Sequence, residues 1–184
     1  MGSINRLRKF NKLKQVERNI PIGSRKESPA EHSWSALILA DYFLDHMSEK
    51  LDRLKVYELL MYHDVVEIRT GDTCISKQKE RENKKEREMI AASELKEEFP
   101  DLLGKKFFSL FMEFEEQKSR EAKFAKAIDQ LEPEIHLLDY KEEWTGWTED
   151  FIRKVKEPLM NEFPEIKEAF EKVTIYAREQ GYFK

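Results

Sequence analysis

The sequence predicts an all-α fold, a single helical bundle, from three observations. Only six glycines and six prolines interrupt 184 residues, which favours long helices over a sheet. Apolar residues recur at helical spacing along most of the chain. The charged fraction of 38% suits helices whose outer faces are strongly solvated. A chain of this length is expected to form one domain with a substantial core.

The N-terminal third is predicted to contain three helices. An amphipathic periodicity predicts the first over residues 4–16. Ser28 and Pro29, an N-cap and a first-turn proline, begin a second helix that runs to about residue 47. A third helix is expected over residues 52–63. We expect the apolar run of the second helix to be buried, namely Trp34, Leu37, Ile38, Ala40 and Leu44.

The middle of the chain contains a nearly continuous charged stretch, residues 77–88. It can be interpreted as a mobile lid or basic arm, or as the solvated start of a helix with alternating charges. We prefer the helix start.

Near the C-terminus, residues 144–148 are predicted to form a turn in which Thr148 caps the next helix. Further helices are expected over residues 89–99, 102–114, 119–138, from about 149, and from 164 to about 178.

Charge and cysteine content narrow the class of protein. A formal net charge of −4 argues against a general nucleic-acid binder, although it does not exclude a small anionic substrate. The single cysteine, Cys74, cannot form an intramolecular disulfide, so a reducing cytoplasm is the expected compartment. Residues 1–14 lack the apolar core of a signal peptide, and no stretch has the length of a membrane span. We therefore expect a soluble cytoplasmic protein that binds no membrane.

An adjacent His63-Asp64 pair lies at the end of an apolar, helix-compatible segment. Glu67 follows one helical turn later, and a Gly-Asp-Thr sequence then ends the helix. Charged groups at the end of a buried helix are costly unless they are paired or bound to a metal. A second histidine, His32, lies in the first turn of another apolar helix. Together these residues indicate a site rather than a chance dipeptide.

These motifs resemble those of the HD-domain metal-dependent phosphohydrolases, most of all the branch that contains the small 5'-deoxynucleotidases. Residues 25–34, 63–73 and 125–133 match successive family motifs, and the similarity runs from about residue 13 to the end of the chain. The resemblance implies a single HD domain over 1–184. Its motif core would span about 13–140, with C-terminal helices over 149–180 packed on it.

The resemblance also implies a metal site. A divalent cation needs imidazole and carboxylate ligands from different helices, with positions left open for water and substrate. Two imidazoles and two carboxylates suit manganese, cobalt, nickel, iron or zinc without selecting one of them. His32 alone would more often be a capping or core-edge residue, and Asp129 gains support from the apolar stripe beside it. The implied metal ligands are His32, His63, Asp64 and Asp129.

Proton transfer and phosphate binding need further residues. Glu67 and Asp72 are the expected catalytic acid–base pair, with Glu67 as our choice for activating water. Asp72 could instead be a capping turn residue. The family resemblance assigns substrate binding to Arg18, and Arg25 precedes the His32 helix, where basic groups favour an anion. Both arginines could also be ordinary solvent-exposed charges.

The expected function is a metal-dependent phosphomonoesterase that releases phosphate from nucleoside 5'-monophosphates, most of all deoxynucleotides. An alternative within the superfamily is cleavage of guanosine tetraphosphate, nucleoside triphosphates or cyclic nucleotides. A second alternative is an inactive metal-binding helical scaffold, although a structural site would need no acid pair. The phenylalanine-rich helices suggest a dimer surface as well as a core, so a homodimer is expected.

Overall fold

The computed structural model describes residues 1–73 and 83–183, and the regular secondary structure of this part of the chain is helical apart from one short antiparallel hairpin. The prediction of an all-α fold is confirmed. In chain order the elements are α1 (Gly2–Leu7), a 3-10 helix (Arg8–Gln15), β1 (Pro21–Ile22), β2 (Arg25–Lys26), α2 (Pro29–His46), α3 (Arg53–Tyr62), a 3-10 turn (His63–Val66), α4 (Glu67–Thr70), α6 (Lys84–Glu98), α7 (Asp101–Glu116), α8 (Arg120–His136), two short 3-10 helices (Leu137–Asp139 and Lys141–Trp144), α9 (Glu149–Met160) and α10 (Pro164–Glu179).

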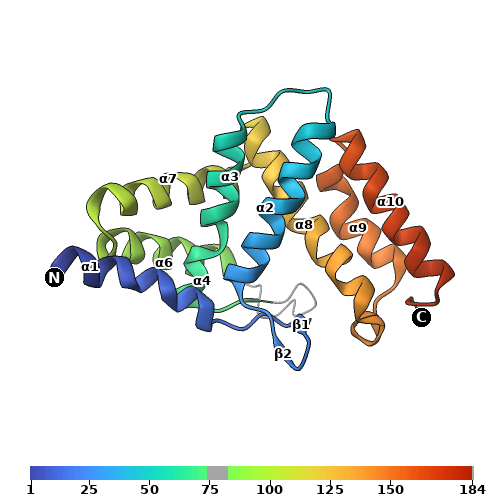
Figure 1. Cartoon of the computed structure of the whole chain (residues 1–184), viewed down its shortest axis with the longest axis horizontal. Helices are drawn as coiled ribbons and strands as arrows, with labels where there is room; N and C mark the ends of the chain where they lie inside the picture. The colour runs from blue at the N-terminus through green and yellow to red at the C-terminus, as the bar shows by residue number, and fades with distance from the viewer. Residues whose placement is uncertain (74–82, 184) are drawn as a thin grey trace.

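Helix α8 is the centre of the bundle. It packs against α2, α3 and α7 on one side and against α9 and α10 on the other, and Figure 1 shows these groups on opposite sides of it. Its buried face is apolar through Phe124, Ile128 and Leu131, none of which is exposed to solvent. Burying such side chains stabilises the fold by roughly 1.5–3 kcal/mol each. Any polar group on this face of α8 is therefore held in the interior.

Local capping explains where several helices begin. The Ser28 hydroxyl accepts a hydrogen bond from the backbone N–H of Glu31, whose carboxylate accepts one from the N–H of Ser28. This capping box and Pro29 confirm the predicted start of α2. Thr148 likewise caps α9, as its hydroxyl accepts from the N–H of Phe151. Favourable caps contribute about 1 kcal/mol each to helix stability.

The first predicted helix is confirmed as helical, but it changes type along its length. The α-helix α1 ends at Leu7, and the chain continues as a 3-10 helix to Gln15. The amphipathic face still docks on the core, because the ring of Phe10 stacks on Phe99 with centroids 3.9 Å apart. The periodicity therefore located the buried face correctly without distinguishing the two helix types.

The expected burial of Trp34 and Ile38 is wrong. Their relative exposures are 66% and 57%, and Tyr42 on the same face is 56% exposed. Helix α2 is apolar around most of its surface and packs through Ala36 and Ala40 instead, so composition alone did not identify its inner face. Despite this apolar character, no helix within residues 1–73 and 83–183 is long and apolar enough to cross a bilayer.

The charged stretch at 77–88 falls only partly within the described residues. Residues 77–82 lie outside them, as does Cys74. From Lys84 onward the stretch is the start of α6, with a Lys84–Glu88 ion pair one turn apart at 3.3 Å. This described portion agrees with the interpretation as a helix start, and Glu88 is buried rather than solvated.

Helices α6 and α7 lie very close together at Gly104. A Cβ atom built on this residue would lie 2.1 Å from the carbonyl oxygen of Lys96, a contact that no side chain tolerates. We therefore expect Gly104→Ala to lower the free energy of unfolding by about 1–3 kcal/mol through forced separation of the helices. Urea denaturation of both proteins measures this difference. An unchanged midpoint would show that the two helices separate at no cost.

Candidate active site

Two histidines and two aspartates meet where α2, the 3-10 turn after α3, and α8 come together. The Nε2 atom of His32 lies 3.1 Å from Oδ1 of Asp129. The Nε2 atom of His63 lies 3.5 Å from the same oxygen and 3.2 Å from Oδ1 of Asp64. His32, His63 and Asp129 are buried, and their ligand atoms lie close enough together to hold one metal ion.

The hydrogen bonds on the far side of each imidazole ring fix its tautomer. Nδ1 of His63 lies 2.7 Å from the carbonyl oxygen of Leu60, and because a carbonyl only accepts, this nitrogen carries a proton. Nδ1 of His32 likewise lies 2.6 Å from the Glu132 carboxylate. Both Nε2 atoms therefore point at carboxylate oxygens, and each offers a lone pair to a cation once the imidazole is neutral; Nε2 of His63 forms no hydrogen bond within the described chain. This arrangement fits a cation, and this donor set suits a divalent transition metal.

The electrostatics of the cluster lead to the same conclusion. Burial lowers the pKa of His63, but Asp64 and Asp129 outweigh it and raise that pKa to about 10. Burial also raises the pKa of Asp64, yet the charge of His63 and that of Arg18 lower it well below its usual range. Without a metal, protons on the imidazoles would neutralise the carboxylates. The site therefore requires positive charge between its ligands.

Metal affinity is expected to rise with pH. In metal-free protein His63 keeps its second proton up to a pKa of about 10, above the ordinary value of 6.5, so an incoming cation must displace it. Affinity should then increase about tenfold per pH unit between pH 7 and pH 9 for each proton displaced. The stability that this proton gives metal-free protein is complete below pH 6.5 and is lost as the pH rises towards 10. Isothermal titration at several pH values in two buffers counts the released protons, and a pH-independent affinity would contradict the assignment.

Arg18 connects the cluster to the hairpin. Its Nη1 lies 3.2 Å from Oδ2 of Asp64, and its Nε lies 3.1 Å from Oε2 of Glu27. The Arg18 backbone N–H also donates to the carbonyl of Glu27, which fixes the arginine against the strand pair. Its Nη2 forms no hydrogen bond to any residue that the structure describes. This nitrogen is therefore free to bind an anion.

Glu67 and Asp72 face the same cavity. Glu67 is only 4% exposed, and its Oε2 has no hydrogen-bond partner among the described residues. Burial, then the charges of Asp64 and Asp72, raise the pKa of Glu67 well above its usual value. Gly71 ends α4 with φ of +68°, a conformation that L side chains rarely adopt, and so turns Asp72 towards the site. A buried, unpartnered carboxyl of raised pKa beside a metal centre is typical of a catalytic group.

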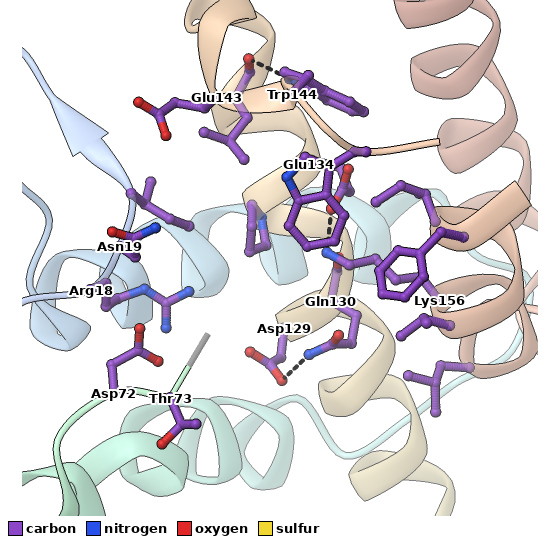
Figure 2. A pocket seen from close by; sticks show the side chains of 18 of the residues that line it. Arg18, Asn19, Asp72, Thr73, Asp129, Gln130, Glu134, Glu143, Trp144 and Lys156 are labelled. Atoms are coloured by element: carbon purple, nitrogen blue, oxygen red, sulfur yellow. Dashed lines mark hydrogen bonds and ion pairs between the residues drawn. The ribbon is translucent and has the colours of Figure 1, made fainter. Parts of the chain in front are cut away.

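A cavity of about 810 Å³ opens from this cluster. Figure 2 shows Arg18, Asp72 and Asp129 on one part of its wall, with Glu134 and Lys156 further along. Lys84 and Lys126 also line it, and Nζ of Lys126 lies 3.0 Å from Oδ2 of Asp129. A space of this size accommodates a small molecule, and its carboxylates, basic groups and apolar walls suit an anionic organic substrate.

The comparisons with known proteins identify this arrangement. The family model for the HD domain matches residues 10–167. The chain belongs to the HD domain family. It is 30% identical to the 5'-deoxynucleotidase HDDC2 of Bos taurus over 80% of this chain and 70% of that protein, and 29% identical to the Homo sapiens protein of the same name over 80% and 71%. The crystal structure titled "predicted metal-dependent phosphohydrolase" from Magnetospirillum magnetotacticum MS-1 superposes with a TM-score of 0.86 at 27% identity, over 99% of this chain and 96% of that one.

Most of the sequence-predicted residues of this HD domain are brought together, and Arg25 is not. His32, His63 and Asp129 form a group that could hold a metal ion, while Arg18, Asp64, Glu67, Asp72 and Asp129 line the cavity. Arg25 instead lies on β2, is exposed, and pairs with Glu31, so the expectation of substrate binding by Arg25 is not supported. The guanidinium of Arg25 is paired with Glu31, the capping-box residue of α2, and does not line the cavity.

Sequence reasoning missed three residues of the HD domain site. Lys126 and Glu132 lie three residues before and after Asp129 on α8, so helical spacing could have placed them on the same face. His136 matches no motif in the sequence, yet it contacts the hairpin and Glu132. Its Nε2 lies 2.8 Å from the carbonyl of Pro21, and its Nδ1 lies within 4 Å of both Glu27 and Glu132. Helical spacing could have predicted the His136–Glu132 contact, whereas the contacts with Pro21 and Glu27 depend on the folded hairpin.

Glu132 is expected to set the metal affinity of the HD domain by orienting His32. Replacing Glu132 with glutamine removes the charge that supports the Nδ1–H of His32, at nearly constant shape. Changes at such supporting residues typically weaken metal binding about 10–100-fold. Competition with a chromogenic chelator measures the affinity, and Glu179→Gln, at an exposed position of α10, is the matched control. An affinity equal to that of the control would show that Glu132 has only a packing role.

Proposed function

We propose that this HD domain protein is a metal-dependent phosphomonoesterase that acts on nucleoside 5'-monophosphates, most of all deoxynucleotides. The observation that carries the proposal is the pair of buried Nε2 atoms facing carboxylates beside Glu67, whose Oε2 has no partner among the described residues, at the wall of a substrate-sized cavity. The choice of nucleotide is supported by the similarity to proteins named 5'-deoxynucleotidase.

The metal would be held by His32, His63, Asp64 and Asp129, and manganese, cobalt, nickel, iron and zinc all fit these ligands. When bound, a divalent ion acts as a Lewis acid, lowers the pKa of water and offsets phosphate charge. The remaining roles fall to the chain itself.

Glu67 would accept the proton of the attacking water, since it is the buried carboxyl with a free oxygen at the cavity wall. Asp72, which faces the same space, would supply a proton to the leaving 5'-oxygen. Phosphate would be bound by the free Nη2 of Arg18 and by Lys126, with Lys84 beside them. The ion pair between Lys126 and Asp129 holds the lysine at the edge of the metal cluster.

Two alternatives remain, and each has a discriminating outcome. An HD hydrolase of anhydrides or cyclic esters would release pyrophosphate, or a monophosphate, rather than inorganic phosphate from its substrate. An inactive scaffold would bind metal and gain stability without turnover. A panel of ribo- and deoxynucleoside monophosphates, triphosphates and cyclic nucleotides, with products separated by ion-exchange chromatography, tests all three. Phosphate release confined to the monophosphates supports the proposal, and release from another class alone would overturn it.

A homodimer also remains a proposal. The phenylalanine argument for it is weak, because six phenylalanines are among the largest fully buried side chains of the core. The exposed Trp34, Ile38 and Tyr42 on α2 give better support, since contiguous apolar surface often marks an association site. Light scattering across protein concentrations measures the oligomeric state. A monomer at every concentration would contradict the proposal.

The cytoplasmic location likewise remains a proposal, supported by the single cysteine.

A further inference from the structure

The cavity continues beyond the metal cluster, along α8 and against α9. Its far wall is formed by Gln130, Pro133 and Glu134 of α8 and by Trp147, Phe151 and Lys156 near and within α9. Glu134 lies five residues after Asp129, about 7.5 Å along the helix axis. This is comparable with the span from the 5'-phosphate of a nucleotide to its base. The phosphate chemistry proposed above uses none of these residues.

A buried ion pair lies in this far wall. Lys156 and Glu134 are only 5% and 4% exposed and form a direct ion pair. Nζ of Lys156 also lies 3.1 Å from the carbonyl oxygen of Gln130, which leaves one of its three N–H donors unused. Oε2 of Glu134 accepts no hydrogen bond from any described residue. A free donor therefore lies beside a free acceptor at the cavity wall, and burying such a pair is costly unless these groups are satisfied.

Aromatic side chains provide an apolar wall in the same part of the cavity. Trp144 is fixed, because it is 2% exposed and its indole N–H donates to the carbonyl of Leu137 at 2.9 Å. Trp147 is only half-buried and packs on Phe151, with ring centroids 5.3 Å apart. Aromatic faces stack on nucleobases with little dependence on sequence, by about 1–3 kcal/mol per base.

We propose that this far wall is the nucleobase subsite, in which Trp147 and Phe151 contact the base and the Lys156–Glu134 pair binds its polar edge. Every nucleobase presents hydrogen-bond donors and acceptors on its edge, which matches one free N–H beside one free carboxylate oxygen. The inference rests on the proposed function, since it takes the phosphate to lie at the Asp129 end of the cavity. Lys156 and Glu134 are then the residues that determine specificity.

The test uses the four deoxynucleosides, which lack phosphate, and follows quenching of tryptophan fluorescence in the full-length protein. Lys156→Met alone leaves Glu134 buried without a partner and could unfold the protein, so the main variant is Lys156→Met with Glu134→Gln. The matched control is Lys154→Met, an exposed position on the same helix. Near-ultraviolet circular dichroism verifies that each variant is folded.

We expect saturable binding of at least one deoxynucleoside, weakened about tenfold or more in the double variant and unchanged in the control. In turnover assays the KM for the matching monophosphate should rise by a similar factor, while hydrolysis of 2-deoxyribose 5-phosphate, which has no base, stays within about twofold of wild type. Equal binding by the double variant and wild type would overturn the inference, as would phosphate release from nucleotides without any deoxynucleoside binding. Deoxynucleoside binding that depends on the pair, in a protein that releases no phosphate, would overturn the proposed function and leave the subsite standing.

Discussion

Replacing Asp129 with alanine is expected to abolish stoichiometric metal binding and to lower kcat/KM by at least about a thousandfold. One oxygen of this carboxylate lies within 3.5 Å of both Nε2 atoms, so it is the shared centre of the ligand group. Burial raises the pKa of Asp129, but Lys126 and the two histidines lower it well below its usual value, which keeps it ionised. Metal ions contribute several kcal/mol of transition-state stabilisation, and each 1.36 kcal/mol is tenfold in rate.

The matched control for this change is Asp139→Ala, an exposed aspartate just beyond α8. It should bind metal and turn over substrate like the wild type. Elemental analysis of dialysed protein gives the metal content, and thermal denaturation verifies folding. Full metal occupancy in folded Asp129→Ala would contradict the ligand assignment.

The second large effect is expected at Glu67. Replacing it with glutamine should lower kcat by about 10²–10⁴-fold, the usual contribution of a general base. Glutamine matches the shape and neutrality of a protonated Glu67, so folding and metal affinity should change little. In the wild type kcat/KM should rise with pH through the raised pKa of Glu67, because only the ionised form accepts a proton, and the variant should lose that rise.

The control for Glu67→Gln is Glu94→Gln, which changes an exposed glutamate on α6 whose side chain is not among those lining the cavity. Its kcat and pH profile should match the wild type. A Glu67→Gln variant with near-normal kcat would remove Glu67 from the catalytic role and leave Asp72 as the remaining acid–base candidate.

The fold could be predicted from the sequence where local signals were sufficient. Helix starts at Pro29 and Glu149 followed from their caps, and the break at Gly71 followed from the residue type. The outer face of α2 could not be predicted, because apolar residues surround that helix and only its neighbours decide which side is buried.

The site was predictable where helical spacing and motif order carried the information. The spacing of His63, Asp64 and Glu67 predicts that they lie together. In the structure Asp64 and Glu67 line the cavity, and His63 belongs to the adjoining cluster with His32 and Asp129. Arg25 could not be excluded in advance, since its pairing with Glu31 depends on the hairpin reversing the chain. The Lys156–Glu134 ion pair could not be predicted from the sequence for a similar reason, because it forms only when α9 packs on α8.

The most direct test of the central claim is a titration of metal-stripped protein with a single divalent ion. Metal binding and phosphate release from a deoxynucleoside 5'-monophosphate are followed in the same samples, with His63→Ala alongside. We predict that phosphate release increases in step with occupancy of the site and is absent in His63→Ala. Release at full rate from metal-stripped protein would contradict a metal-dependent phosphomonoesterase, as would full occupancy without release from any monophosphate.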